Sequence, residues 1–283
     1  MINDKLNILV TNDDGYNAKG IKVLARMMSK YGNVTVIGPK YHQSGMGMAV
    51  SIGIKKLAYK DLGEHDGCHW AYLDSTPASC VKYGINFCDP LPDVVISGIN
   101  HGSNASTAAC YSGTLGAVME AALNGIPGIG VSIDTIHPDA DFSNVEKYFP
   151  AIFEDLMARS RKAPFGVYYN VNFPNINEIK GIRTGHMGLG RWVKEFTDWN
   201  PDIYRRLGMT MEMFSSQMNK EEPGEKFYMM IGTFIDSDAN TPGADHHLVR
   251  DGYISVTAHN IVTSDPTETA ALKSDSNLNK DFR

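Results

Sequence analysis

Apolar runs and helix-like patterns alternate through the first half of the chain. Runs without polar alternation predict four buried strands, at residues 6–11, 33–37, 93–97 and 128–133. Apolar residues at helical spacing predict helices over residues 21–28 and 115–123, and Gly125 and Pro127 end the second one. Strands that are apolar on both faces and are separated by helices are typical of an α/β fold, in which helices cover both faces of a mostly parallel sheet.

The pattern changes after about residue 175. Residues 185–219 are rich in Arg, Trp, Met and polar side chains and have no strong period. We therefore expect a catalytic core over residues 1–175 and a smaller, irregular and partly β extension over residues 176–283. Within the extension, residues 226–235 are predicted to form one strand. A last strand near residues 252–258 is expected to return to the core, before a polar tail that begins at Ser264.

Composition narrows the class of protein without identifying an activity. The chain has 283 residues, a formal charge of −6 and 42 % hydrophobic residues, as expected for a globular protein. It contains no run of Lys or Arg and no apolar segment of membrane-spanning length, so we expect neither duplex nucleic acid nor a membrane as a partner. Four cysteines without a CxxC pair, and a start without signal-peptide features, indicate a cytoplasmic protein with reduced thiols.

The densest polar string, Asn12-Asp13-Asp14-Gly15, follows the first predicted strand directly. A turn begun by the glycine can aim both carboxylates into one crevice, where they repel each other unless a cation lies between them. Mg²⁺ and Mn²⁺ prefer such oxygen ligands. The same four residues are also good turn formers, so a solvated turn is the alternative reading.

Three further polar loops are expected at the same edge of the sheet, because ligands of parallel sheets bind beyond the carboxyl ends of the strands. Ser44 and Gly45 follow the second strand, and Asn100 and Asn104 follow the third. Ser112, Gly113 and Thr114 then begin a helix, whose unpaired N–H groups suit a phosphate. Taken alone, each loop is a weak signal, because Ser and Thr at a helix start are more often simple caps.

Taken together, these strings resemble the SurE family of survival-protein nucleotidases, in order and over nearly the whole chain. The matching segments are residues 8–15, 38–39 with 44–45, 76–77, 96–100, 111–114 and 252–257. The resemblance implies a Rossmann-like three-layer α/β/α core. It also implies metal-dependent hydrolysis of nucleoside 5′- and 3′-monophosphates, in a homodimer or tetramer that exchanges its C-terminal arms.

The resemblance also assigns residues. One divalent ion per subunit, Mg²⁺ or Mn²⁺, is expected on Asp13, Asp14, Ser44 and Asn100. The phosphate is expected among Asn12, Gly45, Asn104, Ser112, Gly113 and Thr114. The chain departs from the family pattern at residues 105–109, where many members carry Gly-Asp-Asp after the position of Asn104. This departure leaves the proposed metal ligands intact and bears on substrate preference and subunit contacts.

The expected mechanism is in-line attack of a metal-activated water on phosphorus, with Asp13 or Asp14 as the base. One alternative is a phosphatase with an aspartyl nucleophile, which normally requires Asp-x-Asp where this chain has adjacent acids. The other is a non-catalytic nucleotide or phosphate sensor with paired acids that bind Mg²⁺. Both alternatives leave the Ser-Gly-Thr helix start and the long extension unexplained, so we favour the hydrolase.

Histidines near these loops have two possible roles. His42 and His101 could contact phosphate or carry a proton, but packing or surface positions are the simpler interpretation. The adjacent pair His246 and His247 is not expected to form a zinc site, because neighbouring side chains do not share a helical face.

Overall fold

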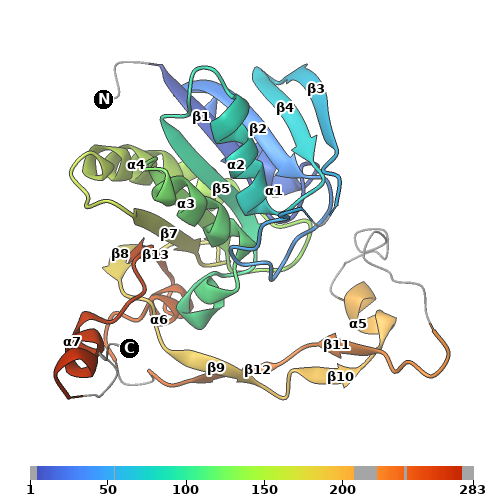
Figure 1. The fold of residues 1–283 in the computed structure, drawn as a ribbon, viewed down its shortest axis with the longest axis vertical. Coiled ribbons are helices and arrows are strands. Elements are labelled where there is room, and N and C mark those ends of the chain that lie inside the picture. Colours follow the sequence, from blue (N-terminus) through green and yellow to red (C-terminus); the bar gives the residue numbers. More distant parts are fainter. Residues whose placement is uncertain (1–4, 54, 207–221, 239–240, 276–283) are drawn as a thin grey trace, which may run out of the picture.

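A nine-stranded mixed sheet forms the centre of the protein. The computed structural model describes residues 5–53, 55–206, 222–238 and 241–275. The strand order is β3-β4-β2-β1-β5-β6-β7-β13-β8, and the six strands from β4 to β7 run parallel (Figure 1). β3 is antiparallel to β4, and β13 is antiparallel to β7. The predicted α/β class with a mostly parallel sheet is confirmed.

Several predicted elements coincide with observed ones. The first and fourth predicted strands are β1 and β6 with their predicted bounds, and the others are longer than predicted. The strands of the sheet are β1 (Leu6–Thr11), β2 (Gly32–Pro39), β3 (Tyr59–His65), β4 (Cys68–Leu73), β5 (Val94–His101), β6 (Gly128–Ile133), β7 (Val167–Phe173), β8 (Gly181–Gly185) and β13 (Tyr253–Asn260). The helices that pack around it are α1 (Lys19–Met28), α2 (Pro77–Phe87), the 3₁₀ turn η1 (Ser106–Cys110), α3 (Gly113–Leu123), α4 (Ser143–Ser160) and α6 (Asp245–Arg250).

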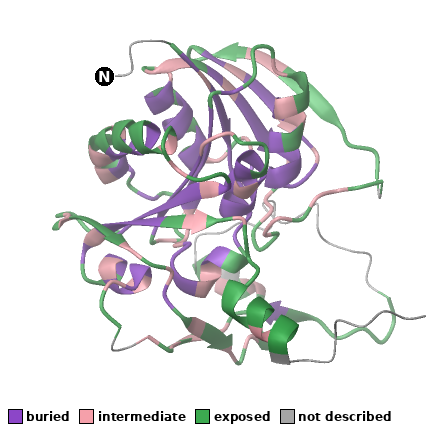
Figure 2. Ribbon diagram, turned by 60° about the vertical axis from the view of Figure 1, so that its left-hand side comes forward, coloured by how far each residue is buried: buried purple, intermediate pink, exposed green. Residues whose placement is uncertain are grey.

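Two helical layers cover the sheet because consecutive strand residues point to opposite faces. In β1, Ile8 and Val10 join the core formed with α1 and α4, whereas Leu9 joins the core formed with α2 and α3. Burial follows the same division, since the central strands are buried throughout and the helices are exposed on their outer surfaces (Figure 2). The core therefore has the three-layer architecture that the apolar runs predicted.

Strands on the two sides of β1 are added in opposite directions across the sheet. The chain proceeds from β1 to β2 on one side, and it later places β5 on the other side of β1. The carboxyl ends of β1 and β5 therefore flank a topological switch point, the usual ligand site of open α/β sheets. The loops that follow β1 and β5 are the ones with the dense polar strings.

A long arm extends from the core on the side of α6 (Figure 1). It consists of two small antiparallel sheets, β9 (Gly190–Val193) with β12 (Thr233–Asp236) and β10 (Phe196–Asp198) with β11 (Tyr228–Met230). The prediction of one strand over residues 226–235 is wrong, because β11 and β12 are separated at residues 231–232. The opposite segment, residues 190–198, bends at Lys194, whose φ is +53°. β12 therefore pairs with β9, and β11 pairs separately with β10.

Two further helices complete the described part of the chain. α5 (Pro201–Arg206) lies near the end of the arm, and α7 (Pro266–Asp275) lies in the tail. The tail that begins at Ser264 therefore contains a helix, and its last residues, 276–283, lie outside the described residues. Within the described ranges, no helix is both long and apolar enough to cross a membrane.

Candidate active site

The acidic pair lies in a tight turn at the end of β1. Asn12 builds this turn, since its Oδ1 accepts a hydrogen bond from Gly15 N at 3.2 Å and its Nδ2 donates to Gly15 O at 3.0 Å. Gly15 has φ of +102°, a conformation that favours glycine. The buried Asn12 side chain thus holds the turn that presents Asp13 and Asp14.

Asp13 is a buried carboxylate beside the start of α3. It is 3 % exposed, and its Oδ1 accepts a hydrogen bond from Thr114 Oγ1 at 2.6 Å. A Cβ atom on Gly113 would lie 3.0 Å from Asp13 Oδ2, so only glycine leaves the carboxylate this room. Burial, and then the charge of Asp14, raise the pKa of Asp13 from 3.8 to about 6. The site therefore favours any group that neutralises this carboxylate.

Two histidines flank Asp14. Its Oδ2 accepts a hydrogen bond from the backbone N–H of His101 at 3.1 Å. The same oxygen lies 2.8 Å from Nδ1 of the His101 ring. Its Oδ1 lies 3.6 Å from His42 Nδ1, and His42 Nε2 lies 2.7 Å from Ser44 Oγ. The loops after β1, β2 and β5 therefore meet around one carboxylate.

The two asparagines expected at the site differ in their surroundings. Asn100 is 6 % exposed near the end of strand β5, and its Nδ2 donates to Gly102 O at 2.7 Å. Asn104 instead belongs to a buried amide network, in which its Nδ2 donates to Ser132 Oγ and its backbone N–H to Asn172 Oδ1, each at 2.8 Å. The described contacts of Asn104 are thus with β6 and β7.

The remaining expected positions lie at the helix start and in the loop after β2. Ser112 caps α3, since its Oγ accepts a hydrogen bond from Leu115 N at 3.0 Å. The N–H groups of Gly113 and Thr114 have no partner within the helix, and they lie next to Asp13 at the positive end of the helix dipole. Gly45 is exposed, with φ of +76°, and no atom lies within 4 Å of the position that a Cβ would take there.

The acidic pair suits a hard divalent cation. Within the described residues, neither Asp13 nor Asp14 forms an ion pair with Lys or Arg; only the two imidazoles approach Asp14. Two adjacent carboxylates, one fully buried, are therefore left without a permanent positive charge. Carboxylate, hydroxyl and amide oxygens from Asp13, Asp14, Ser44 and Asn100 are donors of the kind that Mg²⁺ and Mn²⁺ prefer.

The structure places both His42 and His101 against Asp14, and contact of either ring with phosphate stays a prediction. Their position in loops after strands adjacent to β1 was the available signal. For His246 and His247, the premise that adjacent helix side chains point apart does not hold, because both rings contact the carboxylate of Asp236 in β12.

The fold defines a doubly wound α/β protein, with an acidic pair at its switch point beside a helix N-terminus. Residues 8–194 match the family described as survival protein SurE. The chain is 35 % identical to the 5′-nucleotidase SurE of Bacteroides fragilis over 91 % of its own length and 92 % of that protein's. It is 36 % identical to the 5′-nucleotidase SurE of Cytophaga hutchinsonii, over 88 % of each chain.

A solved structure agrees with these relatives. The crystal structure of a SurE protein from Aquifex aeolicus superposes with a TM-score of 0.73, at 26 % identity, over 94 % of this chain and 98 % of that one. The chain belongs to the SurE family.

Proposed function

We propose that this protein is a metal-dependent 5′-nucleotidase, which hydrolyses nucleoside 5′-monophosphates, and 3′-monophosphates as well, to nucleoside and phosphate. The observation that carries the proposal is the buried Asp13 beside Asp14, without a Lys or Arg partner among the described residues and next to the N-terminus of α3. The naming of its relatives as 5′-nucleotidases over most of the chain supports the substrate class.

One Mg²⁺ or Mn²⁺ ion per subunit is proposed on Asp13, Asp14, Ser44 and Asn100. When bound, such an ion polarises a phosphoryl oxygen and acidifies a coordinated water. The raised pKa of Asp13 fits this role, because a carboxylate that is costly to leave charged and uncompensated gains most from a cation.

The chain's own groups would bind and orient the phosphate. The N–H groups of Gly113 and Thr114 donate to phosphoryl oxygens, and Ser112 holds the helix start that aims them. Asn12, Gly45 and Asn104 complete the proposed phosphate surroundings; Asn12 acts by fixing the turn. Negative charge that develops on the equatorial oxygens is then met by fixed N–H dipoles.

Proton transfer is assigned to the acidic pair. Asp14 or Asp13 takes the proton of the attacking water, which enters in line with the nucleoside oxygen. His101 holds Asp14 through its backbone N–H and Nδ1, so it orients the carboxylate. His42 connects Asp14 to Ser44 and keeps the loop after β2 in place.

The extension is proposed to serve assembly. Trp192, Phe196, Tyr228 and Met230 of the arm are each at least 41 % exposed, a surface that suits contact with a second copy. We therefore keep the division into a core of residues 1–175 and an extension of residues 176–283, and we propose a homodimer or tetramer in the cytoplasm.

Phosphate release from a panel of substrates tests the proposal. The panel contains 5′- and 3′-nucleoside monophosphates, deoxynucleotides and p-nitrophenyl phosphate, each assayed with EDTA-stripped protein and then with added Mg²⁺ or Mn²⁺. Nucleotide-selective, metal-restored release is expected. Folded protein that releases phosphate from none of them contradicts the proposed function and favours a nucleotide-binding protein.

A further inference from the structure

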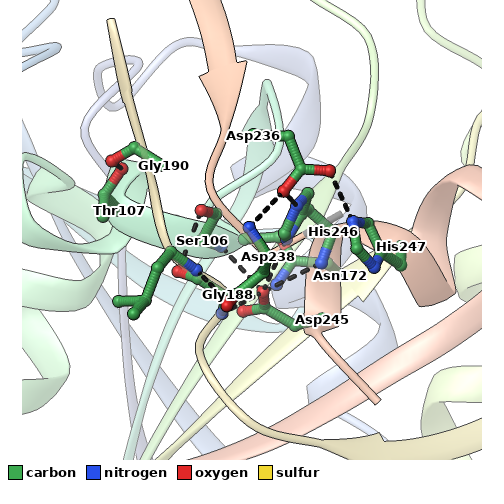
Figure 3. A network of polar contacts seen from close by, with 12 residues as sticks. Ser106, Thr107, Asn172, Gly188, Gly190, Asp236, Asp238, Asp245, His246 and His247 are labelled. Carbon is green, nitrogen blue, oxygen red and sulfur yellow. Dashed lines mark hydrogen bonds and ion pairs between the residues drawn. The ribbon is translucent and has the colours of Figure 1, made fainter. Parts of the chain in front are cut away.

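A second cluster of ligating side chains lies where the arm meets the core. Asp236 ends β12, and His246 and His247 lie in the first turn of α6 (Figure 3). His247 Nε2 is 2.6 Å from Asp236 Oδ2, and His246 Nε2 is 3.2 Å from Asp236 Oδ1. One potential ligand atom from each residue lies within 4.8 Å of the other two.

The 3.2 Å separation of His246 from Asp236 is close to that of neighbouring ligands around a tetrahedral metal, and the 2.6 Å separation of His247 from Asp236 is a hydrogen-bond distance that a bound ion would lengthen. Metal–ligand distances of about 2.0–2.2 Å place neighbouring donor atoms roughly 3.3 Å apart. Two imidazole nitrogens and one carboxylate oxygen form a common ligand set for zinc, with a fourth position for water. The side chains are 10–25 % exposed, so an ion can enter from solvent while the ligands stay ordered.

His246 provides an independent indication. Both of its ring nitrogens are shielded from solvent, and neither makes a directional hydrogen bond to a described residue. Buried nitrogens left in this state cost free energy. A cation bound at Nε2 would satisfy the ring on the side that faces Asp236.

The other nitrogen of His246 faces a buried carboxylate. His246 Nδ1 lies 3.7 Å from Asp245 Oδ1. Asp245 is fully buried and fixed by the backbone N–H groups of Ser106, Gly188 and His246, at 2.8, 2.9 and 2.8 Å. At 3.7 Å the contact between His246 and Asp245 is an ion pair rather than a hydrogen bond, and the charge of Asp245 favours a cation on the ring beside it.

We propose that Asp236, His246 and His247 bind one zinc-class divalent ion that fastens the arm to the core. The ion would join β12 to α6. Close by, Ser106 and Thr107 already bind the start of β9 and the residues just before it. Ser106 Oγ and Thr107 Oγ1 donate to Gly188 O and Gly190 O, both at 2.9 Å (Figure 3). This site contains nitrogen ligands, unlike the all-oxygen set proposed at Asp13 and Asp14, and it is independent of the nucleotidase proposal.

Zinc content of the full-length protein tests this proposal. EDTA-stripped protein is loaded with zinc alone, desalted and analysed for metal per chain. Asp236→Asn and His247→Gln are each expected to lose one equivalent that wild type retains. Asp14→Asn is expected to keep that equivalent, which separates the site from the acidic pair at β1.

A matched control comes from another histidine between two carboxylates. His69 lies 3.3 Å from Asp61 and 3.2 Å from Glu64, but it is only half-buried and offers a single imidazole. His69→Gln is expected to leave zinc content unchanged. Equal zinc content in folded wild type and folded His247→Gln overturns the proposal and reduces the cluster to an ion pair.

Cobalt spectroscopy gives an answer that does not depend on how the cluster variants fold. Co²⁺ added to the stripped Asp14→Asn protein is expected to give the strong visible bands of a four-coordinate site with nitrogen ligands, with one equivalent at saturation. Only the weak absorption of six-coordinate cobalt would contradict a nitrogen-ligated site.

Discussion

Asp13→Asn should make the metal-free protein more stable, although it removes a proposed metal ligand. The substitution keeps the size of the side chain, and the amide oxygen can still accept the hydrogen bond from Thr114. It removes a charge that is buried and lies beside Asp14. The negative charge of Asp13 destabilises the metal-free protein, and the same charge would attract a divalent cation.

The size of the effect follows from the raised pKa of Asp13. A carboxyl group whose pKa is 3.8 when unfolded and about 6 when folded binds more protons in the folded state between these values. Wild type therefore loses stability as the pH rises through this window, and the loss is complete above it. A shift of this size corresponds to about 3 kcal/mol at pH 8, and to about 1 kcal/mol at pH 4.5.

Denaturant unfolding of EDTA-treated protein at pH 8 and pH 4.5 measures this difference. Asp13→Asn is expected to exceed wild type by about 3 kcal/mol at pH 8 and by about 1 kcal/mol at pH 4.5. Asp245→Asn is the matched control, because Asp245 is equally buried but accepts three backbone N–H groups. That variant should lose about 1–3 kcal/mol. An Asp13→Asn protein no more stable than wild type at pH 8 refutes the reasoning.

Three further substitutions test the site. Asp14→Asn should lower turnover of AMP roughly a thousandfold with an unchanged circular dichroism spectrum; near-normal turnover at saturating metal would exclude Asp14 as a ligand. His101→Gln should weaken Mg²⁺ activation or turnover by about 10–100-fold, because it removes the ring that holds Asp14; an unaltered Mg²⁺ activation curve would contradict this role. Gly113→Ala should cost about 1–3 kcal/mol of stability and reduce kcat/KM, since its Cβ would meet the Asp13 side chain at 2.9 Å; unchanged kinetics would show that the contact relaxes freely.

The core was predictable from the sequence because its signals are local. β1 and β6 are short, mostly apolar runs, and turn or helix-start residues follow several of the strands directly. The ends of neighbouring parallel strands must share one edge, so the acidic string and the Ser-Gly-Thr helix start could be expected near each other. The contact between Asp13 and Thr114 agrees with that expectation.

The features that were missed depend on contacts between distant segments. His101 meets Asp14 only because β5 lies directly beside β1, and the spacing of the two residues in sequence carries no trace of this. The arm broke into two sheets because its partner strand bends at Lys194. His246 and His247 contact one carboxylate because Asp236 belongs to β12, a strand of the arm, and the helical positions of the two histidines gave no sign of this long-range contact.

The central claim is that a divalent ion on the acidic pair at β1 enables hydrolysis of nucleoside monophosphates. The most direct measurement is phosphate release from AMP by EDTA-stripped protein during titration with Mg²⁺ or Mn²⁺, with wild type and Asp14→Asn side by side. Release by wild type should rise from background to saturation with the metal, while the variant stays near background. Release that ignores EDTA, or equal release by both proteins, would contradict the account.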